Sequence, residues 1–198
     1  MENLISVFTS KGVLEGKDLQ KALDLSVSAS PEGKCKASYL AGASLMRSGE
    51  YDKGRDMLLE TLDGCYDGQV KLWSDMEKLR TLAAGELALH AGDKGDFETI
   101  LIVEKKLEKD LPTDRLLVRD AKGILASRTK LAEVLRFHKA RAYSASGKVA
   151  EAKSTLKELQ FASGKVFVNG EVTGLKDAIA KLKIEVDGKA FLPFLKAV

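Results

Sequence analysis

Apolar residues recur at intervals of three and four along most of the chain, and short polar breaks separate the periodic segments. This spacing places the apolar side chains on one face of an α-helix. Residues 115–146 continue the pattern, either as one long helix or as two helices joined near residues 127–129. The other predicted helices cover residues 4–11, 17–27, 37–48, 50–62, 70–91, 97–109, 149–161 and 175–184.

The pattern changes after Gly164. Residues 165–173 contain short apolar runs on either side of Asn169-Gly170, a pair that favours the turn of a β-hairpin. We expect a small hairpin or an irregular turn here. The sequence therefore predicts an all-α protein with helices in antiparallel pairs, organised as a helical domain over residues 1–164 and a C-terminal segment over 165–198.

The C-terminal segment ends in a strongly apolar tail, which contains Phe191, Leu192, Phe194 and Leu195. Pro193 makes a continuous helix through this tail unfavourable. Large apolar side chains are stabilised by burial. We therefore expect the tail either to cap the last helices or to dock on a second copy and form a homo-oligomer.

One set of residues recurs along the chain with the same spacing. A small residue lets two helices approach closely, a glycine ends the first helix, and an aromatic or apolar residue two positions later packs over the turn. A third window, with Gly95 and Phe97, departs from the pattern at Glu104. The two full windows are Gly42, Leu45, Gly49, Tyr51, Gly54, Leu58 and Ala140, Tyr143, Gly147, Val149, Ala152, Leu156.

These windows resemble the tetratricopeptide repeat, although the turn glycines here recur at intervals longer than the roughly 34 residues of that family. The resemblance implies stacked helix pairs, as a solenoid or a bundle, with a concave surface that binds a peptide or another protein. It implies a non-enzymatic adaptor or scaffold. The uneven charge of the chain, with a basic stretch beside an acidic one, would steer an acidic partner. The residues that the resemblance assigns to partner binding are Lys36, Tyr39, Met46, Arg47, Val134, Phe137 and Arg141, and we expect both arginines to project into solvent.

Catalytic motifs are not found in the sequence, and we expect no enzyme activity, no cofactor and no metal site. His90 and His138, the two histidines of the chain, do not belong to a recognisable metal-binding pattern. Residues 114–166 hold twelve lysines and arginines against five acidic residues. The stretch 128–141, with Phe137 and Tyr143 among its cations, is therefore an alternative site for nucleic acid.

The cysteine content favours a cytoplasmic location over a disulfide-rich secreted fold. Cys35 and Cys65 bracket one predicted helix pair, so a bridge between them is geometrically conceivable, but we expect both to be reduced thiols. Residues 1–12 lack the pattern of a signal peptide, and no apolar run approaches the ~20 residues of a membrane span. We therefore expect neither secretion nor a membrane partner.

Overall fold

The computed structural model describes residues 1–65, 78–109, 114–119, 125–168 and 171–195, which are mostly helical. The chain divides into two compact units, residues 1–87 and 88–198, and each is described by itself. The hairpin and helix of the C-terminal segment belong to the second unit, so the compact units do not follow the predicted boundary at residue 164.

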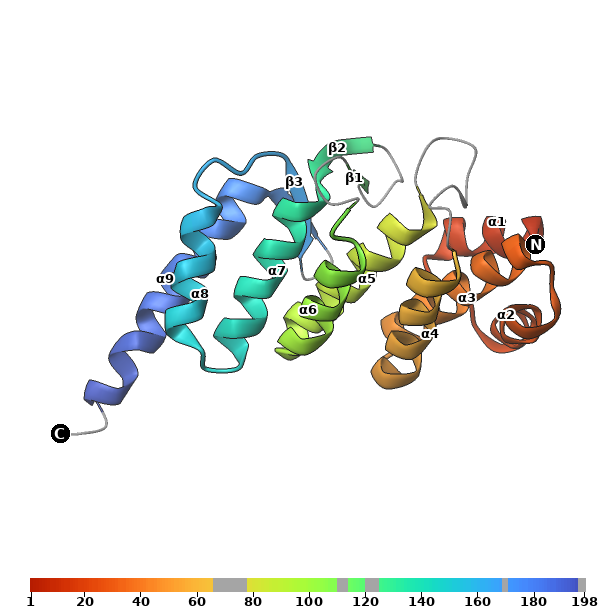
Figure 1. Ribbon diagram of the computed structural model, residues 1–198, viewed down its shortest axis with the longest axis horizontal. Helices are drawn as coiled ribbons and strands as arrows, with labels where there is room; N and C mark the ends of the chain where they lie inside the picture. Colours follow the sequence, from red (N-terminus) through yellow and green to blue (C-terminus); the bar gives the residue numbers. More distant parts are fainter. Residues whose placement is uncertain (66–77, 110–113, 120–124, 169–170, 196–198) are drawn as a thin grey trace. The chain divides into compact units, whose positions relative to one another are not determined.

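The described residues of unit 1 form four complete helices and the beginning of a fifth. Helix α3 packs against both α2 and α4, and α3 and α4 form an antiparallel pair (Figure 1). Ser30 starts α3, because its hydroxyl accepts the N–H of Gly33 and Pro31 takes the first helical position. The helices are α1 (Glu2–Lys11), α2 (Gly16–Ser28), α3 (Pro31–Arg47), α4 (Tyr51–Gly64) and α5 (Leu79–Lys94).

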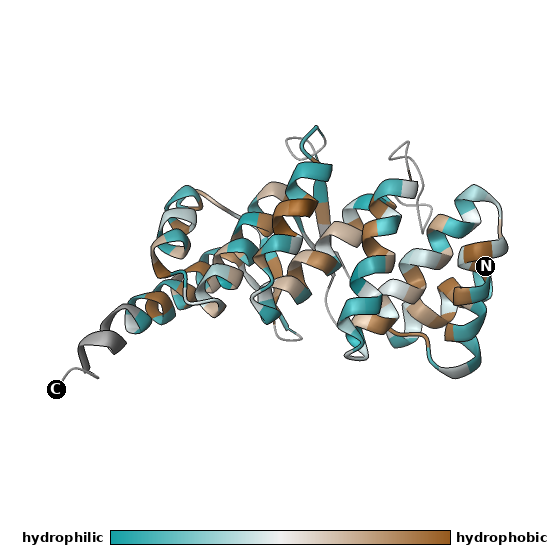
Figure 2. Ribbon diagram, turned by 60° about the horizontal axis from the view of Figure 1, so that its bottom comes forward, coloured by the Kyte–Doolittle hydropathy of each residue, from teal (hydrophilic) through white to brown (hydrophobic). Residues whose placement is uncertain are grey.

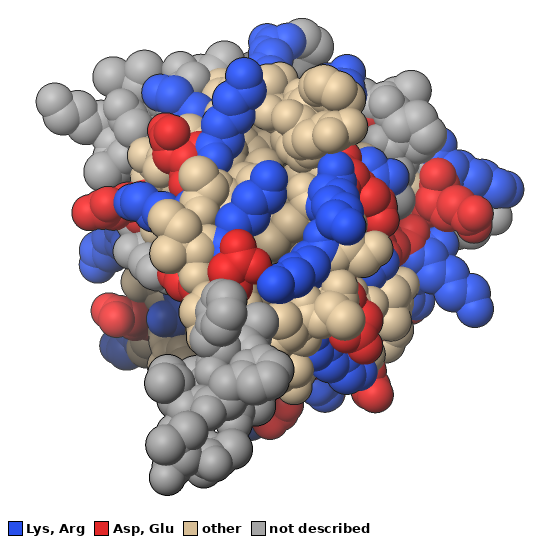
Figure 3. Space-filling view, turned by 90° about the vertical axis from the view of Figure 1, so that its left-hand side faces the viewer, with Lys and Arg blue, Asp and Glu red and all other residues tan. Residues whose placement is uncertain are grey.

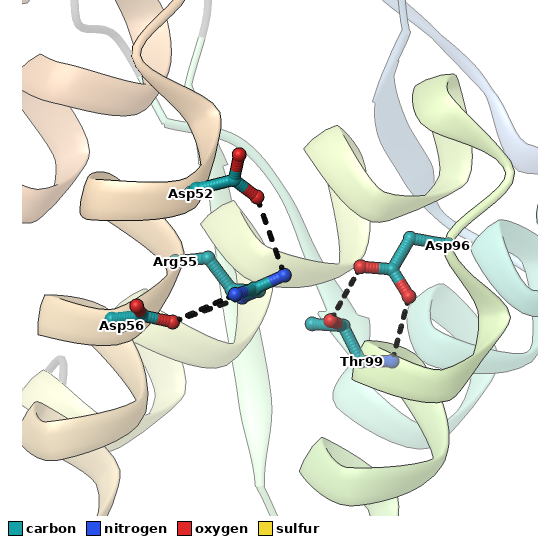
Figure 4. Close-up of polar contacts among 5 residues, drawn as sticks. All are labelled: Asp52, Arg55, Asp56, Asp96 and Thr99. Atoms are coloured by element: carbon teal, nitrogen blue, oxygen red, sulfur yellow. Dashed lines mark hydrogen bonds and ion pairs between the residues drawn. The ribbon is translucent and has the colours of Figure 1, made fainter.

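The α3/α4 pair is held together by small residues. A Cβ atom on Gly54 would lie 2.7 Å from the carbonyl oxygen of Gly42 and 2.5 Å from Cγ of Met46, so the two helices touch through their backbones. On the outer side of α4, Arg55 forms ion pairs with Asp52 and Asp56 (Figure 4).

In the part of unit 2 that the structure describes, the end of α5 is followed by four further helices and two pairs of strands. Helix α6 begins where the Asp96 carboxylate accepts both the N–H and the hydroxyl of Thr99, at 3.1 and 2.7 Å (Figure 4). The elements are α6 (Phe97–Lys106), β1 (Arg115–Arg119), β2 (Leu125–Lys130), α7 (Leu131–Ala145), α8 (Val149–Glu158), β3 (Lys165–Val168), β4 (Glu171–Gly174) and α9 (Leu175–Leu195).

The main core of unit 2 lies between α7, α8, β3 and α9. Phe137 and Leu156 meet Ile179 and Leu182 there. Hydrophobic residues lie mainly between neighbouring helices, and hydrophilic residues line the outer faces (Figure 2). This arrangement agrees with the predicted amphipathic helices. Helix α3 is an exception, since residues 39–46 are buried on all of its sides.

Three turns have the geometry expected from the repeated windows. Gly49, Gly95 and Gly147 have φ angles of 91°, 74° and 74°, in the left-handed region that glycine adopts without strain. The residue after each glycine donates its N–H to the carbonyl five residues earlier, at 2.8–2.9 Å. This bond is the 6→1 hydrogen bond of a Schellman helix end. The predicted left-handed conformations of Gly49 and Gly147 are confirmed.

The helix predicted over residues 115–146 is wrong in its first half. Strands β1 and β2 form an antiparallel hairpin, and the helix begins only at Leu131. The Thr129 hydroxyl donates to the carbonyl of Lys165 at 2.6 Å and accepts its N–H at 3.0 Å, which joins β2 to β3. Leucine fits a helix or a strand, so the tertiary pairing decides between them.

The C-terminal hairpin is confirmed, because β3 and β4 pair with Phe167 opposite Val172. The prediction that Pro193 interrupts the last helix is wrong, since α9 continues through this residue to Leu195. The side chains of residues 190–195, on which the capping and self-association predictions depend, lie outside the described part. Within the described helices, none combines the length and hydrophobicity needed to cross a membrane.

Candidate binding pocket around Arg141

Four of the seven residues predicted to contact a partner lie in the hydrophobic core. Tyr39 and Met46 in unit 1, and Val134 and Phe137 in unit 2, are at most 3% exposed. Tyr39 packs edge-on against Phe8 of α1, and Val134 and Phe137 pack in the hydrophobic cluster that includes α9. Helices of the same chain therefore cover the positions assigned to the binding groove, and this part of the prediction is wrong.

Arg47 is an internal link of unit 1. Its guanidinium pairs with Glu86, donates to the carbonyl of Gly12 and stacks 5.0 Å from the ring centre of Phe8. Burial works against its charge, but the Glu86 carboxylate raises the pKa of Arg47 above its ordinary value. Arg47 lies at the surface, as expected, but it is paired with Glu86 and is not a free cation.

Lys36 also has a partner in its own helix. Its ammonium lies 2.5 Å from the carboxylate of Glu32, one turn earlier on α3. The carboxylate of Glu32 partly cancels the positive charge of Lys36. Lys36 is therefore a weak candidate for attracting a partner.

Arg141 is the centre of a polar network in unit 2. One terminal nitrogen pairs with Asp93 at the end of α5, and the other donates to Nδ1 of His138 at 3.1 Å. The Arg141 side chain is 14% exposed, so its head group still reaches the surface. Arg141 was predicted to project into solvent without a partner. It does reach the surface, but its guanidinium is paired with Asp93.

His138 lies beneath Arg141 and is almost fully buried. Gly92 packs directly against it, since a Cβ atom at this position would lie 3.2 Å from Nδ1 of the imidazole. Burial, together with the charges of Arg141 and His90, holds the pKa of His138 well below its ordinary value. The ring is therefore neutral, and its Nδ1 accepts the hydrogen bond that orients Arg141.

A pocket opens beside this network, between the end of α5, the second half of α7, and α9. It contains about 370 Å³ of space, part of which is open to solvent. Lys189 of α9 donates to the carbonyl and hydroxyl oxygens of Ser144 at 2.9 and 3.1 Å. The residues around the pocket are Gly92, Asp93, Arg141, Ser144, Ala145, Leu182, Glu185 and Lys189.

The pocket combines predicted residues with others that the sequence analysis missed. Arg141 comes from the predicted set, whereas Lys189, Glu185 and Asp93 do not. On α9, Leu182, Glu185 and Lys189 are three and four residues apart, a spacing that places them on one helical face. This spacing is a usable signal, but it becomes informative only when α9 is known to lie beside α7.

The basic stretch 128–141 is largely neutralised. Four of its five cations form ion pairs: Lys130 with Glu133, Arg136 with Glu158, Lys139 with Glu104, and Arg141 with Asp93. Its aromatic residues are also occupied, because Phe137 is buried and Tyr143 packs 5.5 Å from the ring of Phe97. In the described residues there is no cluster of His, Cys, Asp or Glu suited to a metal ion.

Comparison with known proteins adds no relative to this description. No family model matches the chain, and neither a curated protein nor a solved structure matches it.

Proposed function

We propose that this chain is a non-enzymatic, tetratricopeptide-like adaptor that binds a polar segment of another protein, with at least one acidic side chain, in the pocket around Arg141. The observation that carries the proposal is the position of Lys189. Lys189 is an exposed residue whose ammonium lies at the pocket and donates to Ser144, and no carboxylate of the described residues lies within ion-pair distance of it. A carboxylate of a partner supplies the missing counter-charge.

The charges of the other residues refine the expected ligand. Arg141 is matched by Asp93, so it positions the pocket wall more than it attracts an anion. Glu185 contributes an exposed carboxylate, which favours a donor on the partner. A segment with an acidic group for Lys189 and a hydrogen-bond donor for Glu185 pairs with both residues. A purely acidic segment pairs only with Lys189.

Binding is favoured over catalysis by the chemistry of the same residues. His138, the titratable group next to Arg141, is buried and its Nδ1 is occupied, so it is poorly placed to transfer a proton to a bound molecule. The face of unit 2 that includes α9 carries lysine and arginine interspersed with acidic residues (Figure 3). Such mixed charge suits recognition of a protein surface better than a nucleic-acid backbone.

The test uses two lysines of α9. Proteins from the native source are captured on the intact chain, on Lys189→Ala and on Lys183→Ala, and are identified by mass spectrometry. The affinity of the captured partner, and of its peptides with Glu or Asp replaced by Gln or Asn, is then measured by calorimetry. Both lysines are exposed on one helix, but only Lys189 lies at the pocket, so Lys183→Ala is the matched control.

We expect Lys189→Ala to weaken binding about tenfold, which corresponds to ~1.4 kcal/mol, and Lys183→Ala to leave it nearly unchanged. One acidic residue of the partner should lose its effect when Lys189 is absent. Equal affinities for the two variants would contradict the proposal. A steep salt dependence of binding to random oligonucleotides would instead favour the nucleic-acid alternative through residues 128–141. Self-association through the apolar tail remains a separate prediction.

A further inference from the structure

Cys35 and Cys65 meet at one end of the α3/α4 pair, although the sequence analysis expected two reduced thiols. Cys35 lies near the beginning of α3 and Cys65 directly follows α4, and the two are bonded. Their Cα atoms are 5.8 Å apart, a separation typical of disulfides. Both residues are buried, with 7% and 1% of their surface exposed.

We infer that Cys35–Cys65 is a permanent structural disulfide of the working protein, and that the protein works in an oxidising compartment. This inference does not depend on the pocket, and it replaces the expectation of a cytoplasmic location. Cytosolic thiols are kept reduced, whereas secreted and periplasmic proteins retain their disulfides.

The chemistry of formation is ordinary thiol–disulfide exchange. The two thiols lose two protons and two electrons as the sulfur–sulfur bond forms, and the electron pair passes to the disulfide of a thiol oxidoreductase or of oxidised glutathione. Once formed, the bond is shielded from soluble reductants by its burial, which is typical of structural disulfides and not of regulatory ones.

The packing of unit 1 explains why this pair of helices benefits from a covalent link. The buried face of α3 includes Ala37, Ala41, Gly42 and Ala43, which remove little apolar area from water. A disulfide that joins residues 30 positions apart restricts the unfolded chain and so favours the folded state. The bond therefore adds to the stability that the larger buried side chains of the same helix, Tyr39, Leu40, Leu45 and Met46, contribute.

The first measurement is the redox state in the native source. Protein is quenched with acid, denatured, and alkylated with iodoacetamide before and after reduction, and the mass of each product is recorded. We expect no alkyl group without reduction and two after it. Two alkyl groups on the unreduced protein would overturn the inference of an oxidising compartment, and this result does not depend on whether any variant folds.

The second measurement tests the structural role. Reduction of the purified chain should lower its melting temperature by roughly 10–20 °C, given the size of the closed loop and of unit 1. The double variant Cys35→Ser/Cys65→Ser should melt at the same temperature with and without reductant. A chain whose complete reduction leaves the melting temperature unchanged would show that the bond has no structural role.

Discussion

Replacement of Gly54 by alanine tests the closest contact between helices in unit 1. The added Cβ atom would lie 2.5 Å from Cγ of Met46, 2.7 Å from the Gly42 carbonyl oxygen and 2.7 Å from the Met46 backbone nitrogen. Two of these atoms belong to the main chain and cannot rotate away. To restore an ordinary contact of 3.4 Å, α4 must move away from α3 by roughly 0.7 Å, the difference between the two distances.

The magnitude follows from two opposing effects. Overpacking a tight core costs ~1–3 kcal/mol, and the main-chain clashes place Gly54→Ala at the upper end of this range. Alanine regains ~1 kcal/mol through its better helix propensity. We therefore expect a net loss of ~2 kcal/mol, or a melting temperature lower by roughly 8–16 °C, measured by circular dichroism during thermal and urea unfolding.

Gly64 is the matched control, because it lies in the same helix and a Cβ atom there would have no neighbour within 4 Å. Gly64→Ala should raise the unfolding free energy by ~0.4–1 kcal/mol. Met46→Ala removes one of the clashing atoms, so Gly54→Ala should cost less in that background. If Gly54→Ala proves as stable as the parent, the close contact of α3 and α4 is wrong.

Two predictions concern the network in unit 2. The folded state holds the pKa of His138 well below its ordinary value, so below about pH 6.5 the unfolded chain binds a proton that the folded chain does not. The free energy of unfolding, measured by urea titration, should therefore fall by ~1.4 kcal/mol from pH 7.5 to 5.5. His138→Gln should remove most of this difference. Arg141→Glu should lower the unfolding free energy by ~1–3 kcal/mol, since it sets two carboxylates against each other at Asp93. The control Arg136→Glu changes a more exposed cation and should cost under ~1 kcal/mol, and equal losses for both variants would show that Arg141 has no structural role.

The helix pairs and their turns could be predicted from the sequence because their signals are local. A glycine such as Gly49 or Gly147 must follow the first helix of a pair, since the left-handed conformation there strains other residues. The next residues then reveal where the second helix starts. Such information lies within about six consecutive positions, so no tertiary contact is needed to read it.

The first hairpin could not be predicted in this way, because its determinants lie far apart. Residues 115–119 contain leucine and valine in an order that fits a helix as well as a strand. The deciding bonds run from Thr129 to Lys165, 36 residues away. A method that reads periodicity within a short window has no access to that contact.

Four of the residues predicted to bind a partner are buried, for a different reason. The family resemblance identifies one face of the first helix in each pair, but it does not state what covers that face. Here α1 packs over Tyr39, and α9 joins Phe137 in the core, so the aromatic positions are closed. A pocket lies farther along α7, beside Arg141, and Lys189 of α9 contributes a charge to it.

The structure explains why the third window departs from the repeat at Glu104. Glu104 stands where the other windows have Leu58 and Leu156, which fill the seam between paired helices. Its carboxylate instead lies 2.8 Å from the ammonium of Lys139 on α7, with both side chains about one-fifth exposed. The ion pair therefore accounts both for the acidic residue at position 104 and for Lys139 in the basic stretch. The departure of Glu104 from the repeat and one cation of the basic stretch, Lys139, thus form a single contact that joins α6 to α7.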